Sequence, residues 1–306
     1  MPRHTEQPTE GTEPLSVVIA QAVRVLSAAG VPSPRVDAEL LAAYVLGTPR
    51  GRLHTLDGVP SVTAAALAAL VAARAAGAPV QHLTGSGPFR HLDLAVGPGV
   101  FIPRPETELL VDWGIAALAD AADPVVLDLC AGSGAIALAV AQEVPAARVY
   151  AVERDPAALA WLRRNAAARA AAGDRPITIV AGDVTDPGLA AALPAAVDLV
   201  LTNPPYVPAA TPVPPDVRRD PAAAVFGGPD GLAVIRPLAA LAAAVLRPGG
   251  GLAVEHDETG AAAVAALLAA DFLGVAGHAD LAGRPRFTTG WRTDGGDAAG
   301  RGRVVG

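Results

Sequence analysis

The stretch that decides the fold is residues 125–134, which read VVLDLCAGSG. Residues 125–129 predict a buried strand, and the glycine-rich turn after them opens a helix predicted over 135–143. Glycine lets the backbone approach a ligand closely, and ligands commonly bind at such a turn at the carboxyl end of a strand. Gly132, Gly134 and Ala137 also fit the dinucleotide pattern G-x-G-x-x-A, so NAD stays open as a ligand at this point.

Strands and helices alternate along the chain beyond this turn. Further strands are predicted over 148–152, 177–181, 197–201, 251–255, 274–279 and 285–291. Helices are predicted over 105–121, 156–172, 232–246 and 260–269. Such alternation predicts an α/β fold with an open, mostly parallel, doubly wound sheet, and we expect this domain to cover residues 105–292.

The N-terminal part of the chain has a different pattern. Apolar residues at helical spacing predict three helices, over 15–30, 34–47 and 62–76. We therefore expect a small helical bundle without strands over residues 15–80. Residues 89–96 partly alternate between apolar and polar and predict one strand of a β-hairpin linker over 81–104.

Composition limits the kind of protein. The 306 residues suggest about two domains, and the formal charge of −7 argues against a nucleic-acid-wrapping surface, so we expect no stable nucleic acid binding. The chain has no lysine, which excludes Schiff-base and P-loop lysine chemistry. Cys130 is the single cysteine, so no internal disulfide is expected, and the histidines lack the spacing of a metal site.

No targeting segment or membrane span is expected. The longest uncharged apolar runs reach about ten residues, and a membrane helix needs about twenty. The polar N-terminus lacks the apolar region of a secretory signal. We expect a cytoplasmic protein and a monomer, with a polar tail over residues 1–14 and a disordered tail over 293–306.

Two acidic residues follow predicted strands near the glycine turn. Glu153 ends one strand, where its carboxylate can accept hydrogen bonds from the ribose of NAD or of S-adenosylmethionine equally well. Asp183 follows the next strand and can accept from the exocyclic amine of adenine, while Val184 can pack on the ring. Both positions favour a nucleoside-containing cofactor.

Residues 203–206, which read NPPY, directly follow the hydrophobic strand at 197–201. The two prolines remove two backbone donors and stiffen the turn. The acceptors that remain are the Asn203 side-chain oxygen and the Pro204 carbonyl, and two fixed acceptors suit an incoming NH2 group. Pro205 completes the rigid turn, and Tyr206 supplies an aromatic wall for a planar amide or base.

This sequence resembles the class I S-adenosylmethionine-dependent methyltransferases and, within them, the peptide chain release factor glutamine methyltransferases. The NPPY motif alone is shared with enzymes that methylate amino groups of DNA adenine and rRNA guanine. The specific match lies upstream, in PVQHLTG at 79–85 and GVFIPRPETE at 99–108. RVDAELL at 35–41 is similar to the family's N-terminal helical domain, and DP at 220–221 and GGPDGL at 227–232 are similar to its later loop. The resemblance covers residues 15–290.

The resemblance implies methylation of the glutamine side-chain amide in the Gly-Gly-Gln motif of class 1 release factors, with S-adenosylmethionine as donor. It also implies a partner-docking role for the N-terminal bundle. By position, Asn203, Pro204, Pro205 and Tyr206 would hold the glutamine, with Phe101 lining the same pocket. The donor contacts implied or expected are Asp128, Cys130, Ala131, Gly132, Ser133, Gly134, Glu153, Asp183, Val184 and Asn203. Asp220 departs from the glutamate more usual in the family, as does His256-Asp257-Glu258 from a glycine-containing segment.

Several alternatives remain open at this point. A nucleic acid N-methyltransferase would share the NPPY motif, although the acidic charge and the PRPETE block argue against it. An enzyme acting on a ribosomal-protein glutamine would share the motif as well. An NAD-dependent oxidoreductase would leave NPPY without a purpose, and a donor-binding scaffold would not need an intact Asn203 and Pro204.

Overall fold

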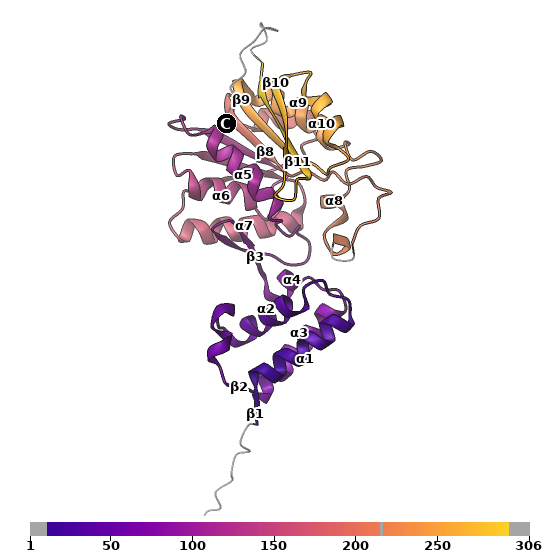
Figure 1. The fold of residues 1–306 in the computed structure, drawn as a ribbon. Helices are drawn as coiled ribbons and strands as arrows, with labels where there is room; N and C mark the ends of the chain where they lie inside the picture. The colour runs from indigo at the N-terminus through magenta and orange to yellow at the C-terminus, as the bar shows by residue number, and fades with distance from the viewer. Residues whose placement is uncertain (1–10, 215–216, 294–306) are drawn as a thin grey trace, which may run out of the picture. The chain divides into compact units, whose positions relative to one another are not determined.

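The computed structural model describes residues 11–214 and 217–293, which fall into two compact units, Met1–Gly85 and Ser86–Gly306 (Figure 1). The predicted disordered tail lies outside the described residues except for residue 293. The predicted polar tail is described only from residue 11, and Thr12–Pro14 within it form a short strand. None of the described helices is both long and apolar enough to cross a membrane.

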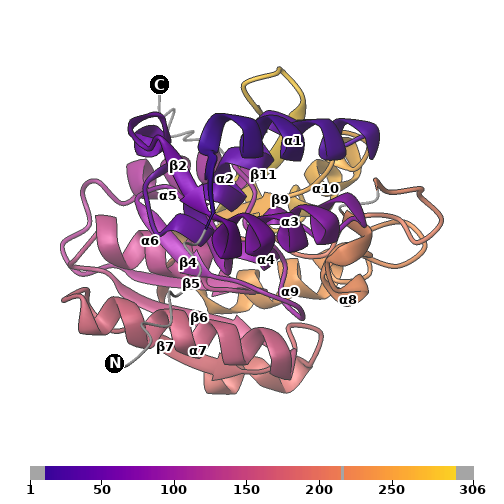
Figure 2. The same cartoon turned by 90° about the horizontal axis from the view of Figure 1, so that it is seen from below.

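The first unit is a helical bundle with a small sheet at its edge. Its main helices α1 (Leu15–Ala28), α2 (Pro34–Leu46) and α3 (Ser61–Ala75) pack against one another (Figure 2). Its short elements are β1 (Thr12–Pro14), η1 (Arg50–Thr55), β2 (Gly58–Pro60) and α4 (Val80–Thr84). β1 and β2 pair antiparallel, so the expectation of a bundle without strands is wrong. Strands this short carry too few residues to show alternation in the sequence.

A buried ion pair joins two helices of this bundle. Arg74 of α3 donates from Nε to Asp37 Oδ2 of α2 at 2.6 Å, and both side chains are buried. Arg74 Nη1 also donates to the carbonyl oxygen of Ala78 at 3.2 Å. The fork of the guanidinium thus fixes the end of α3 to α2 and to the turn that follows α3.

The second unit is built on a seven-stranded sheet of order β10-β11-β9-β8-β5-β6-β7. The strands are β5 (Val125–Leu129), β6 (Arg148–Glu153), β7 (Thr178–Ala181), β8 (Val197–Thr202), β9 (Leu246–Glu255), β10 (Phe272–Ala279) and β11 (Pro285–Arg292). The pairs from β9 to β7 are parallel, and β11 pairs antiparallel with both β9 and β10. The predicted mostly parallel, doubly wound sheet is confirmed.

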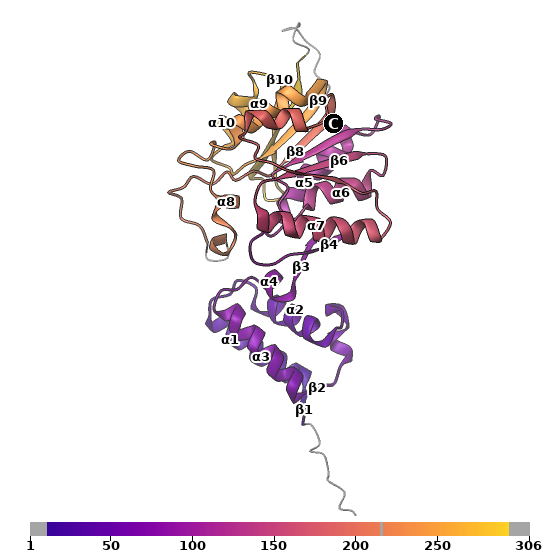
Figure 3. The ribbon, with the colours of Figure 1, turned by 180° about the vertical axis from the view of Figure 1, so that it is seen from behind.

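Helices cover both faces of this sheet and form two apolar cores. One core includes residues of α5 (Glu106–Ala117), α6 (Ala135–Glu143) and α7 (Pro156–Ala171). The other includes residues of η2 (Pro187–Ala192), α9 (Ile235–Val245) and α10 (Ala261–Leu268), the last two of which are seen from behind in Figure 3. The short η3 (Val217–Arg219) and α8 (Ala222–Val225) lie in the long loop after β8.

A β-hairpin opens the second unit. β3 (Ser86–Phe89) and β4 (Leu92–Ala95) pair antiparallel around a turn at Arg90. The predicted hairpin is therefore present, but the strand predicted over 89–96 is limited to Leu92–Ala95 because the turn occupies its first residues. Arg90 adopts a left-handed φ of 52°, which is uncommon for a residue with a side chain. Its guanidinium donates to Glu143 of α6 at 2.5 Å and to Asp112 of α5 at 2.6 Å. These partners, which are distant along the chain, stabilise a turn that the local sequence does not predict.

Candidate active site

The glycine turn joins β5 to α6 with unusual backbone angles. Cys130, Gly132 and Gly134 have φ values of 65°, 55° and 88°, in the left-handed region that favours glycine. A Cβ on Gly134 would lie 2.6 Å from Leu162 Cδ1 of α7, so glycine is also required there by close packing. Asn165 of α7 donates from Nδ2 to the carbonyl of Ser133 at 2.9 Å and holds the turn in place.

Glu153, at the end of β6, is held rigidly beside this turn. Its Oε2 accepts from the Gly132 N–H at 2.9 Å, and its Oε1 accepts from the N–H groups of Arg154 and Asp155, both at 2.8 Å. A carboxylate oxygen has two acceptor positions, so Oε2 can still take a hydrogen bond from a ligand hydroxyl.

Asp183 follows β7 and is engaged within the protein. Its Oδ2 pairs with Arg154 Nη1 at 2.9 Å, and its Oδ1 accepts from the backbone N–H and the hydroxyl of Thr185. Partial burial acts to raise the pKa of Asp183, but the hydrogen bonds from Thr185 and Arg154 outweigh it and lower the pKa below its ordinary value. Asp183 is therefore a fixed anion at neutral pH.

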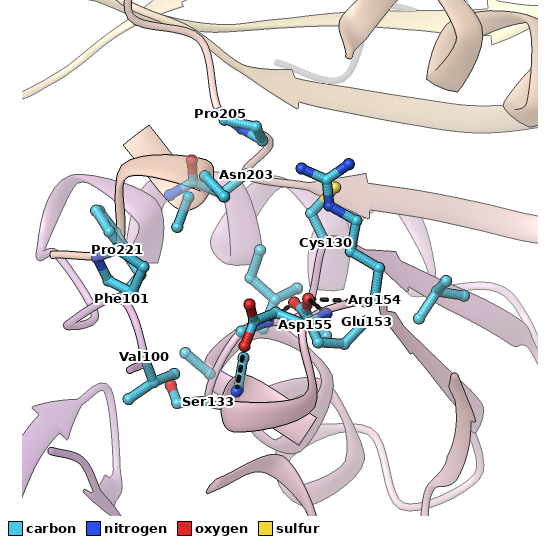
Figure 4. Close-up of a pocket in the computed structure, with 18 of the residues that line it drawn as sticks. Val100, Phe101, Cys130, Ser133, Glu153, Arg154, Asp155, Asn203, Pro205 and Pro221 are labelled. Carbon is cyan, nitrogen blue, oxygen red and sulfur yellow. Dashed lines mark hydrogen bonds between the residues drawn. The ribbon is translucent and has the colours of Figure 1, made fainter. Parts of the chain in front are cut away.

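These elements surround one cavity in the second unit. Figure 4 shows Phe101, Asn203 and Pro221 gathered on one side of it and Glu153 and Arg154 on the other. The predicted site residues that line the cavity are Phe101, Cys130, Ala131, Gly132, Ser133, Glu153, Asp183, Val184, Asn203 and Pro205. The predicted site residues that do not line it are Asp128, Gly134, Pro204 and Tyr206.

Asp128 lies beneath the turn rather than at the cavity. It is fully buried, and its Oδ2 accepts from the Ala137 N–H in the first turn of α6 at 3.0 Å. Burial raises the pKa of Asp128 well above its ordinary value. The structure thus gives Asp128 the role of fixing the start of α6 on β5, and direct donor binding by this residue stays a prediction.

The NPPY turn follows β8 and places Asn203 at the wall of the cavity. Asn203 donates from Nδ2 to the Thr107 Oγ1 of α5 at 3.1 Å. With its N–H side so engaged, the amide oxygen Oδ1 of Asn203 is left to accept a hydrogen bond from a ligand. Thr107 is buried and lines the same cavity. The sequence analysis quoted Thr107 within PRPETE but assigned it no role.

Tyr206 faces a second cavity. It lines this smaller space with Pro208, Leu232 and His256, among others, and its hydroxyl donates to Glu255 Oε1 at 3.4 Å. Burial raises the pKa of Tyr206, so the phenol is protonated at neutral pH. Contact between Tyr206 and a substrate amide stays a prediction.

The long loop after β8 closes one side of the main cavity. Asp220 Oδ1 accepts from the Ile102 N–H at 3.3 Å, and Oδ2 pairs with the guanidinium of Arg104. Arg104 in turn lies over the Phe101 ring at 5.0 Å from its centroid. The residues that follow Asp220 in the loop and line the cavity are Pro221, Ala223 and Ala224.

The cavity fits a nucleoside-containing donor. A Cβ added to Gly132 would meet no atom within 4 Å, so there is open space beside this residue. The neighbouring Glu153 Oε2, which accepts from the Gly132 N–H, can accept one more hydrogen bond. Val184 and the half-buried Cys130 supply apolar surface, and burial raises the pKa of the Cys130 thiol so that it stays neutral. The described part of the chain holds no cluster of three or more His, Cys, Asp or Glu side chains able to bind a metal ion.

Comparison with known proteins gives consistent matches over both units. The model of the PrmC N-terminal domain matches residues 18–85, and that of the methyltransferase small domain matches residues 92–213. The release factor glutamine methyltransferase of Mycolicibacterium smegmatis is 52% identical to this chain over 281 residues, which cover 91% of this chain and 98% of that protein. The enzyme of the same name from Streptomyces coelicolor is 48% identical, with coverage of 89% and 95%. A solved T. thermophilus 16S rRNA N2 G1207 methyltransferase, in complex with AdoMet and guanosine, is 24% identical with a TM-score of 0.46 and covers 68% of this chain and 49% of that one.

Proposed function

Because this chain belongs to the release factor glutamine methyltransferases, we propose that its main cavity and its NPPY turn together form the site of methyl transfer. The enzyme transfers a methyl group from S-adenosylmethionine to the side-chain amide nitrogen of the glutamine in the GGQ motif of class 1 peptide chain release factors. The observation that carries the site assignment is the Asn203 amide, fixed by Thr107 at the wall of the cavity that also holds Glu153.

The donor is assigned to the turn between β5 and α6 and to the strand ends beside it. Glu153 accepts from the ribose hydroxyls, and its backbone hydrogen bonds hold it ready for this. Asp183 accepts from the adenine amine, with Val184 against the ring. The left-handed backbone at Gly132 leaves room for the donor to lie close to the chain. Bound there, S-adenosylmethionine supplies an electrophilic methyl group on sulfur.

The chain contributes orientation rather than a base before transfer. An amide nitrogen is a weak nucleophile because its lone pair is delocalised. Asn203 Oδ1 and the Pro204 carbonyl accept the two N–H groups of the glutamine amide and aim its nitrogen at the donor. The same acceptors stabilise the positive charge that develops on nitrogen, and positioning of this kind is worth up to roughly 7–11 kcal/mol of barrier.

The other substrate contacts follow from position. Phe101 and Pro205 line the cavity beside Asn203 and flank the glutamine side chain, with Tyr206 supporting the turn. The helical bundle over residues 15–80 docks the release factor, and residues 105–292 carry the catalysis. The protein acts as a cytoplasmic monomer and does not bind nucleic acid stably, in line with its formal charge of −7.

Mass spectrometry of a purified release factor, incubated with this protein and S-adenosylmethionine, tests the proposal. The expected result is one added methyl group on the GGQ glutamine, and none on a release factor whose motif glutamine is replaced by glutamate. Asn203→Ala should abolish turnover while the donor dissociation constant, measured by calorimetry, changes much less. Equal loss of turnover and donor binding would contradict the role given to Asn203.

A further inference from the structure

Asn165 is a buried side chain of α7 that joins two segments of the candidate site. Only 3% of its surface is exposed. Its Oδ1 accepts from the Ala95 N–H at the end of β4 at 2.8 Å, and its Nδ2 donates to the Ala95 carbonyl at 3.0 Å. Nδ2 also donates to the carbonyl of Ser133 in the glycine turn at 2.9 Å. One amide group therefore holds the end of the hairpin and the glycine turn together.

The Asn165 amide satisfies these three hydrogen bonds in one orientation only. Its NH2 group has two donors, which meet two carbonyl oxygens, and its oxygen meets an N–H. A turned amide would place Oδ1 against the carbonyls of Ala95 and Ser133 and NH2 against the Ala95 N–H. Ala95 lies opposite Ser86 in the hairpin ladder, so its N–H and carbonyl are paired with Asn165 rather than with β3.

The segment that follows β4, residues 96–101, forms one wall of the main cavity and is called the strap below. Val100 and Phe101 of the strap line the cavity, as does Ser133 of the glycine turn (Figure 4). Phe101 is the strap residue assigned above to the glutamine side chain. Asn165 thus contacts the residue from which the strap starts and a residue of the turn assigned to the donor.

Trp161, one turn earlier on α7, holds the strap at a second point. Its Nε1–H donates to the Pro98 carbonyl at 3.2 Å. A Cβ on Gly97 would lie 2.5 Å from the Trp161 ring, and a Cβ on Gly99 would lie 2.9 Å from the Cβ of Ala157. The strap therefore runs so close to α7 that neither glycine leaves room for a side chain, and α7 fixes its path.

The glycine turn has further hydrogen bonds that do not involve α7. The Gly132 N–H donates to Glu153, and the Gly134 N–H donates to the Ala131 carbonyl at 2.8 Å. Loss of the Asn165 amide leaves these bonds in place, whereas Ala95 loses both of the bonds it makes on the α7 side.

We propose that Asn165 is a positioning residue for methyl transfer, which sets the separation between the strap, where the glutamine binds, and the glycine turn, where the donor binds. This inference rests on the function proposed above. Because the turn keeps its other bonds, a change at Asn165 should displace the strap more than the donor. The rate of transfer should therefore suffer more than the affinity for the donor.

Steady-state methylation of a purified release factor by the full-length enzyme tests the proposal. Asn165→Leu keeps the size of the side chain and removes all three hydrogen bonds. We expect kcat to fall by about tenfold or more, because a displacement of about 1 Å can reduce a rate by up to roughly 100-fold. The KM for S-adenosylmethionine and its dissociation constant from calorimetry should stay close to the wild-type values.

Hydrogen exchange followed by mass spectrometry reports on the contact itself, without catalysis. In Asn165→Leu, a peptide covering residues 92–101 should exchange faster than in wild type, because the Ala95 N–H has lost its acceptor. A peptide covering the β5 strand at 125–129 should exchange as in wild type. This comparison separates a displaced strap from general loss of structure.

Two further variants serve as matched comparisons. Arg169→Met breaks the ion pair with Asp174 on the same helix, and neither residue lines the cavity, so kcat should be unchanged. Trp161→Phe keeps an aromatic ring against the strap but removes the hydrogen bond to Pro98, so kcat should fall while the donor dissociation constant does not change.

Wild-type kcat in Asn165→Leu, a parallel loss of donor affinity, or unchanged exchange over 92–101 would overturn the proposal. If Asn165→Leu does not fold, wild-type kcat in Trp161→Phe would overturn it instead. A wild-type enzyme that methylates no release factor would refute the proposed function, which is a different outcome from a loss confined to the variants.

Discussion

Glu255 should make the enzyme less stable, because its charge is buried at the pH where the enzyme works. Its pKa is raised from 4.5 to about 7 by burial, a shift that corresponds to about 3 kcal/mol between the two ionisation states. The stability contributed by the protonated form is fully present below the unfolded pKa and is lost as the pH rises through about 7. Glu255→Gln removes this cost, so the variant should be more stable than wild type at pH 8 by about 3 kcal/mol and by less than about 1 kcal/mol at pH 5.

Thermal unfolding followed by calorimetry at both pH values measures this difference. For a unit of this size, 1 kcal/mol moves the melting temperature by roughly 2–4 °C, so the gain of about 3 kcal/mol at pH 8 should raise it by about 6–12 °C. His256→Gln serves as the control, because it alters the neighbouring residue and leaves the buried carboxylate in place. An equal gain at pH 5 and pH 8, or none at pH 8, would refute the assignment of a buried, ionised Glu255.

Three further predictions concern the rest of the chain. Arg74→Met leaves Asp37 buried without its cation and should lower the free energy of unfolding by roughly 3–5 kcal/mol, measurable by urea unfolding monitored by circular dichroism; a loss under 1 kcal/mol would contradict the buried pair. Gly134→Ala places a Cβ against Leu162 in a left-handed backbone and should both destabilise the protein and weaken donor binding, as calorimetry would show; unchanged affinity would argue against the turn as the donor site. Asp220→Ala removes the hydrogen bonds that hold the loop at the cavity, and the donor dissociation constant should rise roughly tenfold in titration calorimetry, whereas no change would mean that the loop does not shape the donor site.

The sequence predicts the local features of the fold well because they depend on short patterns. Strands β5 and β8 in the parallel part of the sheet are mainly apolar runs, and the turn at Gly132 and Gly134 needs glycine for its backbone angles. The sequence does not predict the antiparallel pairing of β11 with β9 and β10, because this pairing depends on which edge of the sheet is free. The hairpin turn at Arg90 is stabilised by carboxylates of α5 and α6, which lie far along the chain and leave no local trace.

The same distinction holds for the candidate site. Asn203, Glu153 and Asp183 could be selected because each follows a strand, and the structure brings all three to one cavity. Thr107 could not, because its role arises from a hydrogen bond with Asn203 between elements that only the fold places together. Asp128 follows the same strand-end pattern as Glu153, yet its carboxylate turns toward the first turn of α6. A pattern in sequence gives the position of an acid but not the direction of its side chain.

The order of the strands also bears on how the protein is made. β11 is the last of the described strands along the chain but lies inside the sheet, between β9 and β10, and the Arg286 carbonyl accepts from the His256 N–H beside Glu255. During synthesis, β9 must therefore remain an open edge until residues 285–292 have left the ribosome. A product that stops short of them would expose unpaired backbone groups along β9, which is the kind of edge that recruits other strands. The last step in assembling this sheet and the completion of the Glu255 environment are thus a single event, late in translation.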